Sequence, residues 1–133
     1  MSLDKALSDA IAAIPECVAG AYIDMSLGML ISVKTLDSHP QEVLDMVAAA
    51  TADLFQGPMV TQIENSFKKS RGSTDSHHYF QEMLIFSDNL IHVFIRTKMY
   101  PDHVISFVCR KSANVGMVLA KSRMQIDGIC EEL

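Results

Sequence analysis

The amino-acid sequence predicts an α/β protein of the α+β type, in the order helix, strand, strand, helix, strand, strand, strand, helix. Its hydrophobic residues recur at helical spacing, then twice at strand spacing, at helical spacing over a long stretch, three times at strand spacing, and finally at helical spacing. Turn-forming residues separate these segments. A length of 133 residues, with 49% hydrophobic and 20% charged residues, is typical of one folded domain. We therefore expect a single domain over residues 1–133.

The first segment predicts a short amphipathic helix followed by a hairpin. Ser2 suits the N-cap of the helix, and Pro15 would end it. The apolar residues between them recur every three or four positions: Leu3, Leu7, Ala10, Ile11 and Ile14. Residues 17–23 and 29–35 predict two strands, and the turn chemistry of residues 24–28 would join them.

The next stretch predicts a long helix over residues 40–69. Ser38 suits its N-cap and Pro40 its first turn. Gly57 and Pro58 interrupt the pattern, and an internal proline removes a hydrogen bond and crowds the preceding turn. We therefore expect one long helix that is bent or briefly broken there. Its apolar positions are Val43, Leu44, Val47, Ala48, Thr51, Leu54, Phe55, Met59, Val60, Ile63 and Phe67.

Three further strands follow a polar loop, over residues 79–86, 90–98 and 104–110, and a closing helix begins at about Asn114. Across an even-length first turn, three pairs would share a face that we expect to be buried: Phe86 with Ile91, Leu84 with Val93 and Glu82 with Ile95. The opposite face is mixed, and the long helix is the candidate to cover part of it.

Glu82 is the one charged residue in those three pairs. An isolated charge at a buried position would be expensive. Glu82 would therefore pair with Arg96 or with a group from a second subunit, unless the twist at the strand end exposes it to water.

Charge and cysteine usage exclude several classes of function. The net charge of −5 argues against nucleic acid as a partner, and the basic cluster within residues 68–71 suits a helix C-terminus. Cys17, Cys109 and Cys130 are widely spaced, without the C-x-x-C pair of a zinc or redox site. No apolar run reaches the length of a membrane span. We expect a cytoplasmic protein with reduced thiols and no membrane insertion.

The sequence offers few residues for chemistry. Asp75, His77 and His78 have metal-ligand types, but adjacent loop histidines rarely converge on one ion. Cys109 and His92 could be drawn as a thiol and base on neighbouring strands, yet no third orienting group or oxyanion loop accompanies them. No phosphate-binding glycine loop is present. We expect no metal, no cofactor and no enzymatic activity.

The element order and the opening motif together resemble the roadblock family of dynein light chains and their bacterial relatives, within the profilin-like and longin-like group. The motif comprises residues 14–24, in which Gly20 would let a helix approach closely, and residues 28–32. The resemblance implies a five-stranded antiparallel sheet with helices on both faces. It also implies a homodimer formed through residues 40–69 and the edge strand 79–86.

An apolar edge strand supports the dimer independently, because an unpaired edge is an aggregation hazard unless a partner pairs with it or a helix covers it. Pairing with a second copy would protect the edge, although the long helix alone could also do so. The predicted interface comprises Val47, Leu54, Phe55, Val60, Ile63, Phe80, Glu82 and Leu84.

The resemblance implies a non-catalytic homodimeric adaptor, since the bacterial relatives regulate Ras-like small GTPases by binding them. Two alternatives remain. One is a small-molecule sensor, with Met83, Phe94 and His92 lining a pocket. The other is a structural subunit of a larger complex, which would use the same dimer without a GTPase.

Overall fold

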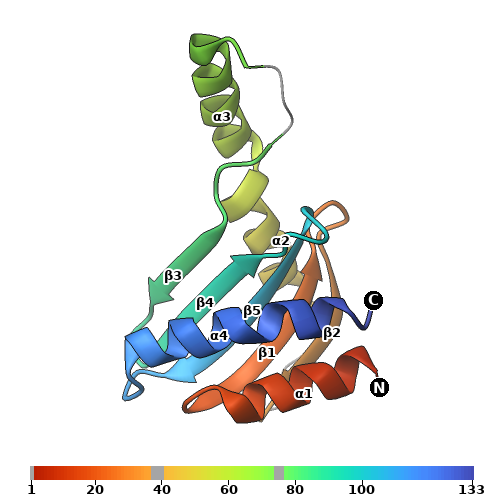
Figure 1. Ribbon diagram of the computed structural model, residues 1–133, viewed down its shortest axis with the longest axis vertical. Helices are drawn as coiled ribbons and strands as arrows, with labels where there is room; N and C mark the ends of the chain where they lie inside the picture. Colours follow the sequence, from red (N-terminus) through yellow and green to blue (C-terminus); the bar gives the residue numbers. More distant parts are fainter. Residues whose placement is uncertain (1, 37–40, 74–76) are drawn as a thin grey trace.

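The computed structural model describes residues 2–36, 41–73 and 77–133, and within them it places five strands in one antiparallel sheet (Figure 1). The strand order is β2-β1-β5-β4-β3, which leaves β2 and β3 at the two edges. The strands are β1 (Cys17–Asp24), β2 (Met29–Thr35), β3 (Glu82–Phe86), β4 (Leu90–Arg96) and β5 (His103–Arg110). The predicted fold class and element order are confirmed, except that the long helix is divided.

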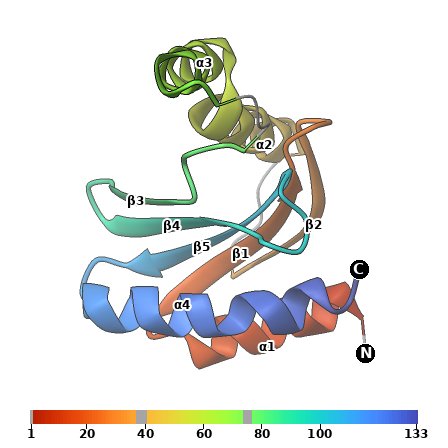
Figure 2. The same ribbon diagram turned by 45° about the horizontal axis from the view of Figure 1, so that its top comes forward.

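Helices cover both faces of the sheet, as Figures 1 and 2 show. On one face, α1 (Leu3–Ala13) and α4 (Val115–Cys130) lie side by side and contact β1, β2, β4 and β5. On the other, α2 (Gln41–Gln56) contacts β1 and β2. The next helix, α3 (Pro58–Arg71), packs on α2 and extends away from the sheet.

The contact between α1 and β1 depends on a small residue, as predicted. A Cβ on Gly20 would lie 3.2 Å from the side chains of Ile11 and Phe107. The Ser2 hydroxyl accepts a hydrogen bond from the Lys5 amide at 3.2 Å and so caps α1. Between these helices and the sheet lies the larger core cluster, with Leu7, Tyr22, Ile91, Val93, Ile105, Phe107 and Val118 fully buried.

Gly57 and Pro58 divide the predicted long helix into two, so of the two expectations, a bend or a brief break, the structure has the break. Gly57 has an extended backbone (φ −68°, ψ 174°) and is the N-cap of α3, and Pro58 occupies the first turn. A Cβ on Gly57 would lie 2.6 Å from the Asp53 carbonyl oxygen, so this close approach requires glycine. The predicted caps at positions 38 and 40 lie outside the described residues.

The predicted register of the β3–β4 hairpin is confirmed, with Glu82 opposite Ile95, Leu84 opposite Val93 and Phe86 opposite Ile91. Both strands are shorter than predicted. The chain before β3 bends toward α3 because the Tyr79 amide donates a hydrogen bond to Glu64. We expected this face of the hairpin to be buried, but its β3 side chains are exposed. Helix α4 packs on β4 and β5 and leaves Leu84 and Phe86 of β3 uncovered.

A second core cluster lies under α2, on the opposite face. Phe55 of α2 is fully buried and its ring meets that of Phe94 edge-on, with centroids 6.4 Å apart. Ala48, Ile23 and Val104 complete the contact. The first half of the predicted long helix therefore covers part of this face, as expected.

Candidate protein-binding surface

One face of α2 carries apolar side chains that the chain itself does not cover. Val43, Met46, Val47 and Leu54 recur at helical spacing, and the exposed fraction of each side chain lies between 42% and 70%. Ala48 and Phe55, on the other side of the helix, point into the second core cluster. The helix is thus apolar on both of its sides, and one of them has no partner among the described residues.

The same pattern continues on α3. Met59, Ile63 and Phe67 recur every four residues and are 70%, 49% and 55% exposed. An isolated helix of this length is marginal in water, and most helices gain their stability by packing an apolar face. We call the exposed apolar residues of α2 and α3 the helical stripe: Val43, Met46, Val47, Leu54, Met59, Ile63 and Phe67.

The strand β3 forms an open edge of the sheet, and the segment that leads into it contacts α3. It pairs with β4 on one side, and among the described residues no strand lies on its other side. Three of its apolar side chains are exposed, on both faces of the sheet: Leu84 at 37%, Ile85 at 38% and Phe86 at 53%. Phe80, just before the strand, is 41% exposed. We call these four residues the β3 edge.

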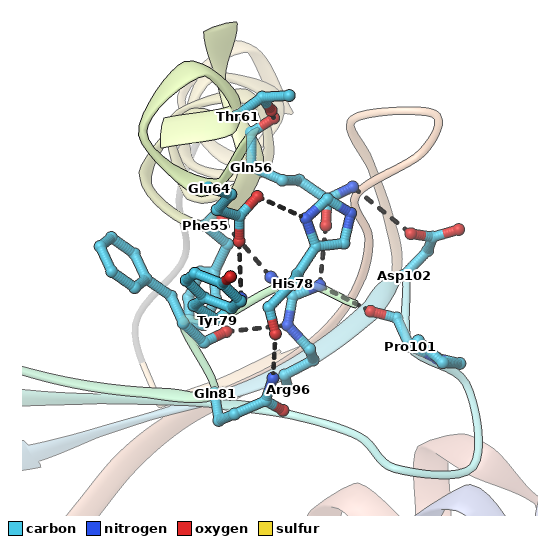
Figure 3. A network of polar contacts seen from close by, with 11 residues as sticks. Phe55, Gln56, Thr61, Glu64, His78, Tyr79, Gln81, Arg96, Pro101 and Asp102 are labelled. Carbon is cyan, nitrogen blue, oxygen red and sulfur yellow. Dashed lines mark hydrogen bonds and ion pairs between the residues drawn. The ribbon is translucent and has the colours of Figure 1, made fainter. Parts of the chain in front are cut away.

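Glu64 links α3 to the segment that leads into β3 (Figure 3). Its carboxylate is 2% exposed, lies 2.9 Å from the His78 Nδ1 and accepts a hydrogen bond from the Tyr79 amide at 2.6 Å. Burial alone would raise the pKa of Glu64, but the hydrogen bonds from Tyr79 and His78 outweigh it and lower the pKa. The ionised carboxylate therefore fastens α3 beside the β3 edge.

Aromatic contacts strengthen the same junction. The Tyr79 ring lies 6.3 Å from the Phe67 ring, and the Lys68 ammonium and Arg71 guanidinium stand over it at 5.7 and 5.2 Å. Phe67 belongs to the helical stripe, so this contact connects the stripe physically to the chain just before the β3 edge.

Arg96 fixes the other end of this arrangement (Figure 3). It is 4% exposed, and its guanidinium donates to the Phe80 carbonyl at 2.8 Å, to Gln56 Oε1 at 2.7 Å and to the Pro101 carbonyl at 2.7 Å. It also stands over the Phe55 ring, 5.4 Å from its centre. One side chain thus joins the end of α2, the start of the β3 segment and the β4–β5 turn.

The predicted interface residues do not all lie on this surface. Phe55 is inside the core, so we leave it out of the surface. Val60 is partly buried. Glu82 forms an ion pair with Arg123 of α4 at 2.6 Å, not with Arg96 as one prediction had it. The others are exposed: Val47, Leu54, Ile63, Phe80 and Leu84.

The residues considered for chemistry are not brought together. Cys109 faces Ile91 across the strands while His92 faces Val108, so Cys109 and His92 point to opposite sides of the sheet. His78 is engaged by Glu64, and Asp75 lies outside the described residues. Within the described ranges, no three His, Cys, Asp or Glu side chains are grouped as metal ligands.

Two of the three residues proposed for a sensor pocket, Phe94 and Met83, pack in the core. Phe94 is 8% exposed and packs in the second core cluster, and Met83 packs against the same cluster. The His92 Nε2 instead lies 2.9 Å from the Ser87 hydroxyl. In the part of the chain that the structure describes, no helix has both the length and the apolar character needed to cross a membrane.

Sequence reasoning missed Glu64, and it named Arg96 only as a partner for Glu82. Glu64 precedes Lys68 by four residues, a spacing typical of an exposed ion pair on a helix. Arg96 ends a strand in which inward and outward residues alternate, so its burial was not indicated by its position. Both are buried because segments distant in the sequence meet over them, and no local pattern records that.

No protein-family model and no curated protein matches this sequence. The structure, in contrast, matches solved structures over nearly its whole length. A roadblock/LC7 domain from Streptomyces avermitilis superposes with a TM-score of 0.68 at 14% identity, covering 98% of this chain and 97% of that chain. An MglB structure with a tetrameric arrangement superposes with a TM-score of 0.70 at 14% identity, covering 98% of this chain and 86% of that chain.

Profilin II from Acanthamoeba castellanii also matches, with a TM-score of 0.62 at 11% identity over 99% of this chain and 100% of that chain. At these identities the likeness establishes the fold and not the activity. The chain has the fold of the roadblock/LC7 domains, which is also similar to that of profilin, as its element order predicted.

Proposed function

We propose that this protein is a non-catalytic homodimeric adaptor that binds a second protein. The observation that carries the proposal is the exposed helical stripe on α2 and α3, whose Phe67 ring lies 6.3 Å from the Tyr79 ring just before the unpaired β3 edge. Soluble monomers rarely expose large contiguous apolar patches, and long apolar edge strands are normally paired or covered. A second copy of the chain would satisfy both requirements at once.

The dimer that fits this surface has two-fold symmetry. Two β3 edges would pair antiparallel, which continues the sheet from one copy into the next, and the two helical stripes would pack against each other. Glu64 and Arg96 would act as positioning residues, since they hold α2, α3 and the β3 segment in one arrangement before the partner arrives.

A Ras-like small GTPase is the partner that we propose for the dimer. The support is the roadblock fold together with the resemblance of the opening motif to the family whose bacterial members regulate such GTPases. The solved MglB structure with a tetrameric arrangement is consistent with a fold that self-associates. In this proposal the adaptor contributes a binding surface and leaves nucleotide chemistry to the GTPase.

Affinity capture from the native cell extract tests the partner. Tagged wild-type protein should recover a small GTPase, and recovery should depend on whether a GTP analogue or GDP is added. Met124→Lys is the control and should recover the GTPase as the wild type does. Met124 is 69% exposed and belongs to α4, which packs on the opposite face of the sheet from α2. Recovery of a fixed complex without a GTPase, insensitive to nucleotide, would favour the structural-subunit alternative.

A further inference from the structure

Cys17 and Cys109 are direct partners across the β1–β5 ladder. The Arg110 amide donates to the Glu16 carbonyl at 3.0 Å, and the Cys17 amide donates to the Ile14 carbonyl at 3.3 Å. In an antiparallel ladder this pattern marks a non-hydrogen-bonded pair, whose Cα atoms stand about 4.5 Å apart with their side chains close together. A disulfide spans Cα separations of about 4.4–6.8 Å. The ladder therefore places two free thiols at bonding range.

The local backbone favours contact between the two sulfurs. Cys109 belongs to the larger core cluster and Cys17 packs against that cluster, and the register shifts between Cys17 and Ala19, where a bulge re-aims the chain. The neighbouring Cys109 thiol lowers the pKa of Cys17, although burial opposes it, and Cys17 together with burial raises the pKa of Cys109. Cys17 is the thiol more readily ionised.

Accessibility also distinguishes the thiols. Cys17 is partly exposed, whereas Cys109 and Cys130 are 0% and 1% exposed. A small oxidant in solution therefore reaches Cys17 first, and Cys109 is reached from Cys17. An exposed attacking thiol beside a resolving thiol is the arrangement of reversible redox sites.

We propose that Cys17 and Cys109 form a reversible thiol–disulfide site that is oxidised by hydroperoxides. The Cys17 thiolate attacks the O–O bond of hydrogen peroxide, takes up one oxygen as a sulfenic acid and releases hydroxide. The Cys109 sulfur then attacks the Cys17 sulfur, the S–S bond forms, the S–O bond breaks, and the proton of Cys109 leaves with the hydroxyl as water. The two thiols lose two electrons, the peroxide gains them, and a dithiol reductant reverses the reaction.

Peptide mapping tests the site on the wild-type protein. The three cysteines fall in three different tryptic peptides, residues 6–34, 99–110 and 124–133. Folded protein is treated with hydrogen peroxide, remaining thiols are alkylated, and the digest is analysed by mass spectrometry. We expect a link between the first two peptides that forms at least about tenfold faster in the folded chain than in urea, because the fold holds the thiols together.

Three variants define the order of steps. Cys109→Ala should leave a sulfenic acid on Cys17 that dimedone traps. Cys17→Ser should give neither the dimedone adduct nor the disulfide-linked peptides. Cys130→Ala should form the link between the Cys17 and Cys109 peptides as the wild type does. Circular dichroism checks that each variant is folded. The proposal is overturned if the wild-type link forms no faster in the folded chain than in urea, if it involves Cys130, or if oxidation stops at a dimedone-reactive Cys17.

Discussion

At the scale of single residues, Arg96 is the side chain on which the arrangement of the proposed surface depends most. It satisfies three carbonyl or amide oxygens from three separate segments. Removal leaves those partly buried acceptors without this donor. We predict that Arg96→Ala lowers the free energy of unfolding by about 2–4 kcal/mol in urea titrations.

Arg123 offers the matched control for Arg96. Its ion pair with Glu82 lies at the surface, where water and salt screen the interaction. Arg123→Ala should therefore lower the free energy of unfolding much less than Arg96→Ala does. Equal losses for the two variants would contradict the role given to Arg96.

Glu64 predicts a dependence of stability on pH. Its pKa in the folded chain is lowered from the ordinary value of 4.5, so the folded state favours the ionised carboxylate. The stability that this preference contributes is present above about pH 4.5 and is lost as the pH falls below it toward the folded pKa. Wild type and Glu64→Gln should therefore differ in unfolding free energy at pH 7, and the difference should shrink as the pH falls below 4.5. A difference that does not change below pH 4.5 would show that Glu64 does not act through its charge.

At the scale of elements, the break between α2 and α3 is set by Gly57. Gly57→Ala would bring a Cβ to 2.6 Å from the Asp53 carbonyl oxygen, and the backbone must move to relieve the clash. We predict a loss of about 1–3 kcal/mol in unfolding free energy. Gly128→Ala in α4 is the control, because its Cβ meets nothing within 4 Å. It should be neutral or stabilise by up to about 1 kcal/mol, since alanine favours the helix. An unfolding free energy that Gly57→Ala leaves unchanged would contradict the close approach of Gly57 to the Asp53 carbonyl oxygen.

The elements also show what the sequence could predict. Hydrophobic period and turn residues predicted the strand β2, the cap at Ser2 and the β3–β4 register correctly, because each depends on neighbours in the chain. The exposure of Leu84 and Phe86 could not be predicted in this way. It depends on how far α4 extends across the sheet, which is a property of tertiary packing.

At the scale of the whole molecule, the candidate surface too could be predicted only as far as it depends on neighbours in the chain, and tertiary packing decides the rest. Five apolar residues of the predicted interface are exposed, while Phe55 has the same spacing but faces the core. Helical periodicity shows that a helix has an apolar side, but α2 has two, and the sequence does not say which of them faces the sheet. The structure assigns the sides through the contact of Phe55 with Phe94.

The solution mass tests the account most directly, measured by light scattering coupled to chromatography. Wild-type protein should have twice the chain mass of 14.7 kDa at micromolar concentration. Ile63→Lys in the helical stripe and Leu84→Lys in the β3 edge should each shift the mass toward the monomer while the chain stays folded. Met124→Lys should stay dimeric. A monomeric wild-type protein, or a dimer unaffected by both substitutions, would contradict the proposed assembly.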